Sequence, residues 1–175
     1  MKLGVVSDTH KHIVNLSKAI ELLKAMGVDR IIHLGDDYGD IDEVGERDAI
    51  RIPGVFSDFY QRKDIQNRRI ENFAGWRFLL THTVASHPHD LPGDPVPEEL
   101  INARKVQVVL HGHTHIPEIR QENGVIFLNP GHLKNEDKKG FPPSFGYIEL
   151  TINKILMRIY DLRDRSIKQE EKYLR

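Results

Sequence analysis

LGVVSDTH, residues 3–10, and RIIHLGDD, residues 30–37, decide the fold of this 175-residue chain. Each is a short apolar run that stops at polar residues, which is the pattern of a buried strand ending in a loop. Between them, apolar side chains recur at helical spacing from Ile13 to Met26, and Gly27 follows as a helix end. Strand, helix and strand in this order form a βαβ unit, which predicts parallel strands joined by a right-handed crossover.

The rest of the chain favours further strands. A third strand is predicted at 49–52 and a fourth at 106–110, with hairpins at 69–80, 116–128 and 146–160. A short helix is predicted at 98–104, after a proline-rich loop. The last 15 residues, 161–175, are highly charged and predict a surface helix or tail. Neither a repeat nor a long linker interrupts the pattern, so we expect one domain over residues 1–175, with a two-layered β core flanked by helices.

Composition excludes several classes of protein. Zero cysteine removes disulfides, cysteine zinc sites, iron–sulfur clusters and cysteine nucleophiles, and it fits a cytoplasmic location. The net charge is −1, from 25 basic and 26 acidic residues, which gives no overall field for gripping nucleic acid. No apolar run approaches the roughly 18 residues of a membrane-spanning helix, and the first residues have no apolar signal core. The unusual number is the histidine count of ten.

Side chains that bind metals follow four of the predicted strands. They are Asp8, His10, Asp36, His82, His113 and His115. Because ligands bind at the carboxyl ends of parallel strands, we expect these groups to meet at one rim. Mixed aspartate and histidine ligands suit Mn, Fe, Co, Ni or Zn. The six residues exceed the ligand set of one catalytic zinc but suit two ions, roughly 3.5–4 Å apart, that share a carboxylate. Such a pair hydrolyses phosphate esters with water as the nucleophile.

The motifs Asp8-Thr9-His10, Gly35-Asp36 and Gly112-His113-Thr114-His115, with His82 between them, resemble the calcineurin-like metallophosphoesterase superfamily. The chain length and Asn129-Pro130-Gly131 are similar to its small bacterial and archaeal phosphodiesterase branch. This resemblance implies an α/β fold, a four-layer α-β-β-α sandwich of two mixed sheets flanked by helices. It also implies hydrolysis of a phosphodiester by hydroxide that a dinuclear metal centre activates. We favour manganese, with nickel, iron, cobalt or zinc as alternatives.

Carried over by position, the resemblance implies two overlapping ligand sets. The first ion would take Asp8, His10, Asp36 and His115, and the second would take Asp36, His82 and His113. Asp36 would bridge the two ions.

The chain departs from the family pattern at three places. The family supplies an asparagine to the second metal where this chain has Val55, and Ser57, Asp58 or water are the candidates to replace it. His12 and His132 also differ from the usual residues, and both are candidate catalytic groups that face the phosphate or transfer a proton.

Other readings stay open. The same fold serves as a protein-interaction scaffold in the small retromer subunit, so a weak or inactive enzyme that binds proteins is the alternative function. A nuclease would need a basic groove, and nucleic acid is a conceivable but unsupported partner. The expected partner is a small phosphate ester, without a membrane, and homo-oligomerisation is left open. The remaining interpretations favour a structural role for His33 and His111, exposure of His87 and His89, and a solvated basic face at Arg62, Lys63, Arg68 and Arg69.

Overall fold

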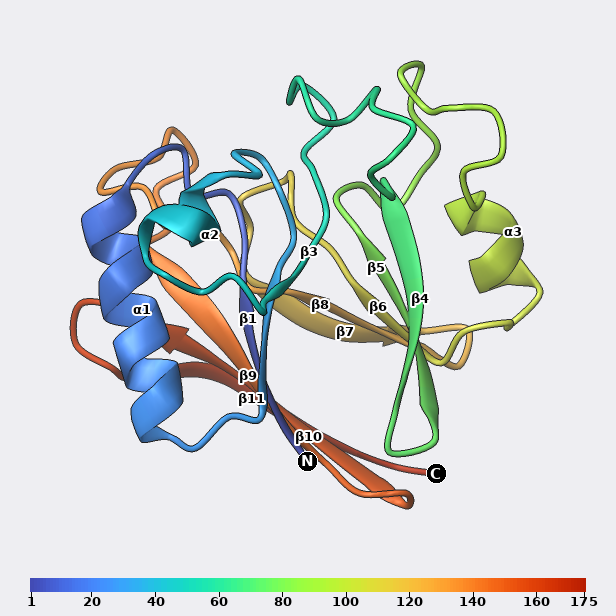
Figure 1. Ribbon diagram of the computed structural model, residues 1–175. Coiled ribbons are helices and arrows are strands. Elements are labelled where there is room, and N and C mark those ends of the chain that lie inside the picture. The colour runs from blue at the N-terminus through green and yellow to red at the C-terminus, as the bar shows by residue number, and fades with distance from the viewer.

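Two mixed β-sheets lie face to face in the computed structural model, which describes residues 1–175 (Figure 1). The six-stranded sheet has the order β11-β10-β9-β1-β2-β3, and the five-stranded sheet has the order β4-β5-β6-β8-β7. The strands of the first sheet are β1 (Lys2–Val6), β2 (Arg30–His33), β3 (Ile50–Arg51), β9 (Ser144–Leu150), β10 (Lys154–Asp161) and β11 (Ile167–Leu174). Those of the second are β4 (Arg68–Phe73), β5 (Trp76–Thr81), β6 (Val108–Leu110), β7 (Glu118–Glu122) and β8 (Val125–Asn129).

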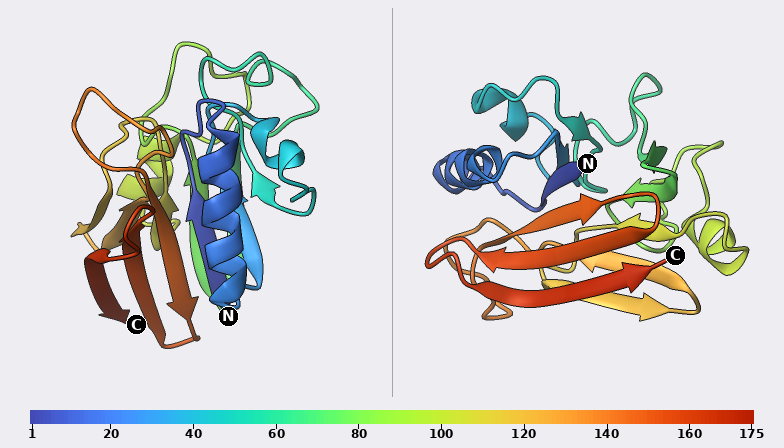
Figure 2. Two further views of the ribbon diagram at one scale, coloured as in Figure 1. Left: turned by 90° about the vertical axis from the view of Figure 1, so that its left-hand side faces the viewer. Right: turned by 90° about the horizontal axis from the view of Figure 1, so that it is seen from below.

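Helices cover the outer faces of both sheets, and the views in Figure 2 show these layers from the side and from below. The helices are α1 (Ile13–Ala25), α2 (Asp40–Glu43) and α3 (Pro97–Asn102). The first two pack on the six-stranded sheet and the third packs on the five-stranded sheet. The expected four-layer sandwich is confirmed. None of the helices is long and apolar enough to cross a membrane.

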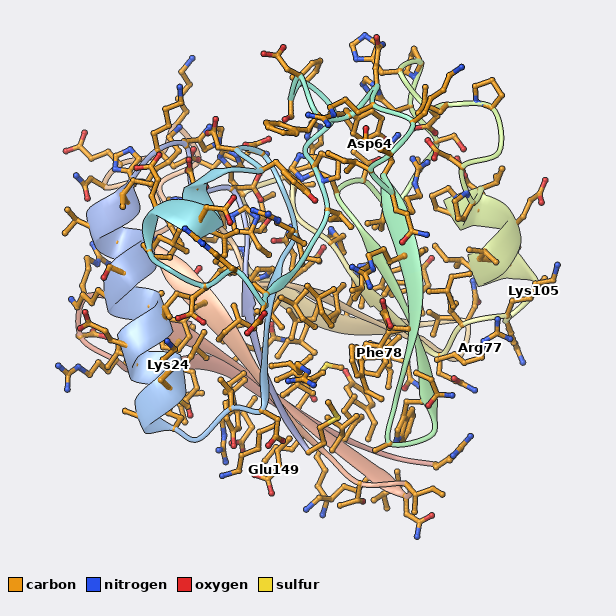
Figure 3. All side chains as sticks on the ribbon, viewed as in Figure 1. Lys24, Asp64, Arg77, Phe78, Lys105 and Glu149 are labelled. Atoms are coloured by element: carbon orange, nitrogen blue, oxygen red, sulfur yellow. The ribbon has the colours of Figure 1, made fainter.

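The core follows from the alternation of side chains along the strands. In β5, Phe78 and Leu80 join the cluster of 19 buried residues between the sheets, whereas Leu79 joins the smaller cluster beneath α3. Figure 3 shows Phe78 inside the fold, and its neighbour Arg77 is exposed. This alternation buries apolar side chains on both faces of the sheet, so the sheets are held on a rigid core beneath the loops at their ends.

The carboxyl ends of the strands that precede the predicted metal ligands lie at one edge of the molecule. In the first sheet β1 pairs with β2 in parallel, and in the second β5, β6 and β8 run parallel to one another. Figure 1 shows the loops that follow β1, β2, β5 and β6 at the upper end of the sheets. The motifs predicted to bind metal occupy these loops. The βαβ expectation for the start of the chain is confirmed, because β1 and β2 pair in parallel and α1 connects them.

The prediction of a surface helix or tail at 161–175 is wrong, because β11 occupies residues 167–174 and pairs antiparallel with β10. Most side chains of β11 are exposed, since it is the edge strand of its sheet, and charged residues on an edge strand hide its alternating pattern. Tyr173 packs against the core between the sheets. The Gln169 side chain exchanges two hydrogen bonds with the backbone of Ile119 in β7, which ties β11 to the other sheet.

The predicted basic face is also corrected, because its four residues do not form one solvated surface. Arg68 is buried, with 1% of its side chain exposed, and its guanidinium contacts Asp90 at 2.9 Å. Asp90 also accepts a hydrogen bond of 2.5 Å from the hydroxyl of Tyr60. A buried arginine needs a paired carboxylate. Arg68 is therefore an interior residue paired with Asp90, and its predicted place on a solvated face is wrong.

Candidate metal centre

Four of the predicted ligands gather at the rim, from the loops that follow β1, β2 and β6. One ligand atom of each lies within 4.8 Å of all the others, and the residues are Asp8, His10, Asp36 and His115. His10 Nε2 lies 2.7 Å from Asp36 Oδ2 and 3.0 Å from His115 Nε2. His115 Nε2 lies 3.3 Å from Asp8 Oδ1. The structure thus contains a potential metal-binding cluster, built from residues up to 107 positions apart (115 − 8).

His82 contacts the oxygen of Asp36 that does not face His10, and His113 lies beside His82. His82 Nε2 is 3.2 Å from Asp36 Oδ1, and the rings of His82 and His113 are 5.1 Å apart between centroids. The two oxygens of Asp36 therefore face different histidines, Oδ2 towards His10 and Oδ1 towards His82. A carboxylate placed in this way can bridge two cations.

The buried ring of His82 tests whether this pocket fits a cation. Its Nδ1 donates a hydrogen bond of 2.8 Å to the carbonyl of Leu34, which leaves the lone pair of Nε2 directed away from the backbone. Nε2 has no hydrogen-bond partner, because its contact with Asp36 lacks hydrogen-bond geometry. An unsatisfied buried nitrogen costs about 1–3 kcal/mol, and a divalent cation would satisfy it. The residues therefore fit a metal ion.

Electrostatics favour positive charge at the same point. Burial opposes ionisation of the Asp36 carboxyl, but the close imidazoles of His10 and His82 outweigh burial and hold the pKa of Asp36 well below its ordinary value. Burial disfavours a charged His82, yet the carboxylates of Asp36 and Asp8 outweigh burial and raise the pKa of His82. Both shifts show that the groups around Asp36 favour positive charge at this point.

The backbone of these loops is strained at the ligand positions. Five of the six predicted ligands have positive φ angles, namely Asp8 (51°), His10 (46°), Asp36 (39°), His113 (67°) and His115 (60°). Left-handed backbone is uncommon for residues with a side chain and costs about 1–3 kcal/mol at each position. Strain concentrated at one cluster is typical of a functional site.

Two glycines allow the loops to come this close. A Cβ atom at Gly112 would collide with the hydroxyl of Ser7, and one at Gly54 would lie 2.5 Å from Asp36 Cα. Ser7 donates to Asp8 Oδ2 at 2.5 Å, and the amide of His113 donates to both oxygens of Asp8. The loop after β6 is therefore fastened to the loop after β1 through the carboxylate of Asp8.

A carboxylate that orients His115 was not predicted from the sequence. Asp137 Oδ2 lies 2.7 Å from His115 Nδ1, and 4% of the Asp137 side chain is exposed. Partial burial opposes ionisation, but the hydrogen bond with His115 outweighs it and holds the pKa of Asp137 well below its ordinary range. The bond fixes a proton on Nδ1 and leaves Nε2 facing the cluster.

The match to known proteins decides the family. The calcineurin-like phosphoesterase superfamily domain matches residues 1–153. The chain belongs to this superfamily. As a calcineurin-like phosphoesterase, it is 29% identical over 150 residues to phosphodiesterase MJ0936 of Methanocaldococcus jannaschii, which covers 75% of the chain and 83% of the relative. It is also 25% identical over 189 residues to phosphodiesterase YfcE of Escherichia coli K12, with 95% of each covered.

Solved structures of the same fold include a protein of another kind. Vacuolar protein sorting 29 from Cryptosporidium parvum aligns with a TM-score of 0.72 and 19% identity, over 99% of this chain and 98% of its own. At that identity the likeness shows the fold alone. The family assignment of this calcineurin-like phosphoesterase therefore rests on the domain match and the phosphodiesterase relatives, whose names describe hydrolases.

The segment that departs from the family pattern offers this phosphoesterase no replacement ligand within the four-residue cluster. Val55 is 1% exposed, so its side chain is buried, and its carbonyl accepts a hydrogen bond of 3.0 Å from His89 Nδ1. Ser57 Oγ accepts from the amide of Phe59, and Asp58 is exposed and outside the cluster. A role of Asp58 as a ligand stays a prediction, which unchanged metal content in Asp58→Ala would rule out.

The two candidate catalytic histidines of this phosphoesterase lie in different surroundings. His12 is half-buried at the first residue before α1, and its side chain caps no backbone amide of that helix. His132 is fully buried beside His115, with ring centroids 5.4 Å apart. Its Nε2 donates to the carbonyl of Phe141 at 3.1 Å, and its Nδ1 accepts from the amide of Lys134. Proton transfer through His132 would require one of these bonds to break, so both roles stay predictions.

The remaining histidines of this phosphoesterase lie outside the four-residue cluster. His33 is fully buried, and its Nδ1 accepts from the amide of Gly35, one residue before Asp36. His111 is buried beside Gly112. His89 is exposed and His87 is half-buried, so the expected exposure holds for the first and only in part for the second. Asn129 donates to the Gly112 carbonyl and to Thr114, and so clamps the loop that carries two of the predicted ligands.

Proposed function

We propose that this chain hydrolyses phosphodiesters with two divalent metal ions held at the strand ends. The observation that carries the proposal is the carboxylate of Asp36, which presents Oδ2 to His10 at 2.7 Å and Oδ1 to His82 at 3.2 Å. A single ion would need a histidine beside only one of these two oxygens. The first ion would be held by Asp8, His10, Asp36 and His115, and the second by Asp36, His82 and His113.

Bound divalent ions would lower the pKa of water and neutralise charge on the phosphoryl oxygens, which is the chemistry that a phosphodiester needs. Mixed carboxylate and imidazole ligands favour manganese, with Ni, Fe, Co and Zn as alternatives. The chain itself supplies fixed positions. Asp8 is held by Ser7 and by the His113 amide, and His115 is held by Asp137. Ligands held in this way lose little conformational freedom when the substrate binds.

Proton transfer to the leaving oxygen is assigned to His12. Its side chain is half-buried two positions after His10 and makes no capping bond, so its ring nitrogens are available. His132 would contribute through His115, whose ring it contacts, because both of its own nitrogens are engaged with the backbone. Replacing each histidine by glutamine in a separate variant distinguishes these roles, since only the His12 change would alter the dependence of rate on leaving-group pKa.

The competing function is a protein-interaction scaffold of the same fold, which the likeness to vacuolar protein sorting 29 brings into view. A scaffold gains nothing from five strained ligand positions and an unsatisfied buried nitrogen. Those costs favour the enzyme.

The test is hydrolysis of bis(4-nitrophenyl) phosphate by protein stripped with EDTA and then supplied with Mn²⁺, Ni²⁺ or Zn²⁺. We expect turnover only after metal is added, and a loss of at least about 100-fold in Asp36→Asn, whose amide cannot bridge two cations. Asp164→Asn, an exposed carboxyl between β10 and β11, is the matched control. A folded wild-type protein without turnover under any of the three metals would overturn the proposal and leave the scaffold.

A further inference from the structure

Phe56 is exposed beside the proposed centre, and burial in the core does not explain its position. Its side chain is 73% exposed. Full burial of a phenylalanine stabilises a protein substantially, so a fixed exposed ring forgoes that gain. The ring lies two residues after Gly54, whose amide donates to the carbonyl of Asp36. Its centroid is 6.3 Å from that of His113. The exposed ring is therefore anchored next to the ligands.

The surroundings of Phe56 hold it in one place. Val55, directly before it, is buried, and its carbonyl accepts a hydrogen bond from His89. The rings of His87 and His89 lie 5.6 Å and 6.0 Å from the Phe56 ring, both at nearly right angles to it. Edge-to-face contacts of this kind fix ring orientation. These two histidines come from the loop after β5, so two loops converge on the ring, and Figure 1 shows both at the upper end of the sheets.

Two hollows include Phe56 in their lining, and their charges differ. One, of about 390 Å³, is lined by Lys11 and by four carboxyl side chains, Asp37, Asp40, Glu43 and Asp58. This hollow repels a phosphate. The other, of about 320 Å³, is lined by Val55, Phe56, Ser57, Asp58, Gln61 and His89. It combines an aromatic face with a hydroxyl, an amide and one carboxylate, which suits an uncharged planar group with polar edges.

We propose that Phe56 and the smaller hollow bind a planar aromatic group carried by the phosphodiester, and so select aromatic esters over ringless ones. This inference rests on the proposed hydrolysis at the neighbouring centre. The stacking chemistry is shared by a nucleobase and by a simple aryl group. Ser57 and Gln61 offer hydrogen bonds to the polar edge of a nucleobase, which an aryl ring lacks, and the experiment separates the two sources.

The test compares three substrates in the Mn²⁺-loaded protein. They are adenosine 2′,3′-cyclic phosphate, bis(4-nitrophenyl) phosphate and glycerophosphocholine, which has no ring. We expect Phe56→Leu to lower the ratio of kcat/KM for both aromatic substrates to that for the ringless one by about tenfold, mainly through KM. Phe56→Tyr, which keeps the ring, should preserve the ratio. A larger loss for the adenosine ester in Gln61→Ala than for the aryl ester would identify a nucleobase, and equal losses would identify an aryl group.

A second readout does not depend on turnover. Calorimetry in EDTA compares AMP with ribose 5-phosphate, and the wild type should bind AMP about tenfold more tightly, a preference that Phe56→Leu abolishes. Equal ratios in Phe56→Leu and the wild type, together with no preference for AMP, would overturn the inference. Turnover of none of the three substrates by the wild type would overturn the proposed hydrolysis instead, and calorimetry would still decide the role of Phe56.

Discussion

Asp137 Oδ2 accepts a hydrogen bond from His115 Nδ1 across 2.7 Å, although the two residues lie 22 positions apart in the chain. Asp137 belongs to the loop between β8 and β9, and Lys134 contacts the same carboxylate at 3.2 Å. A carboxylate behind a metal-binding histidine fixes its tautomer and raises its basicity. This pair therefore decides whether His115 presents a lone pair or a proton to the cluster.

Asp137→Asn should weaken metal binding about 10- to 100-fold, since an amide orients the ring less firmly and carries no charge. The measurement is a competition titration of the metal-free protein with Mn²⁺ and a chelating indicator. Asp137→Glu, which keeps the charge, should recover part of the affinity. Unchanged affinity in Asp137→Asn would show that the contact only holds the loop.

His113 tests whether the strained backbone is retained for function. Its φ angle of 67° favours glycine, and its side chain is exposed. In EDTA, His113→Gly should be more stable to urea than His113→Ala by about 1 kcal/mol, because only glycine adopts this conformation without strain. Both variants remove the same ring, so they form a matched pair, and both should lose metal affinity. Equal stability of the two would mean that His113 carries no strain.

His33 predicts how stability changes with pH. Burial lowers the pKa of His33 from 6.5 to about 4, because desolvation disfavours the charged ring more than the nearby Asp8 favours it. Between pH 6.5 and 4 the unfolded chain binds the extra proton, so this residue contributes stability above that window that is lost as pH falls through it. Its slope is at most about 1.4 kcal/mol per pH unit.

Urea unfolding of the metal-free protein at pH 7, 6 and 5 measures this slope. His33→Asn, which cannot take up a proton, should show a shallower loss of stability than the wild type over the same range. His12→Asn, a half-buried histidine outside the core, is the control. Identical slopes in wild type and His33→Asn would contradict the buried, neutral state of His33.

Arg68 and Asp90 join the start of β4 to the loop that follows β5. Arg68 lies at the start of β4, and Asp90 accepts from its guanidinium, from Tyr60 and from the amide of His87. Asp90→Asn should cost about 3 kcal/mol, because it leaves a buried guanidinium without its charged partner. Arg68→Met with Asp90→Asn should cost less than Asp90→Asn alone. Thermal and urea unfolding measure both, and a double variant as unstable as the sum of the single changes would refute the pairing.

Much of the architecture could be predicted from local pattern. The strands β1 and β2 are short apolar runs flanking a helical repeat, and the polar residues that end them carry the first ligands. The rule that parallel strands meet at their carboxyl ends was enough to bring Asp8 and Asp36 together.

The remaining features depend on contacts between distant segments. No local signal distinguishes the charged edge strand β11 from a solvated tail, because its exposed side chains leave no apolar alternation. The sequence predicts Arg68 as a surface charge, because its partner Asp90 lies 22 positions away in another segment. In the same way Asp137 is one acid in a charged loop, and only the folding of that loop against His115 distinguishes it. The left-handed φ angles at five ligands also could not be predicted from the sequence, since none of the five residues is a glycine.

A crystal grown with Mn²⁺ tests the two-ion centre most directly, through anomalous scattering above and below the manganese edge. We expect two manganese peaks about 3.5–4 Å apart, with one oxygen of Asp36 on each, His82 and His113 on one ion, and Asp8, His10 and His115 on the other. A single peak, or peaks that Asp36 does not bridge, would contradict it.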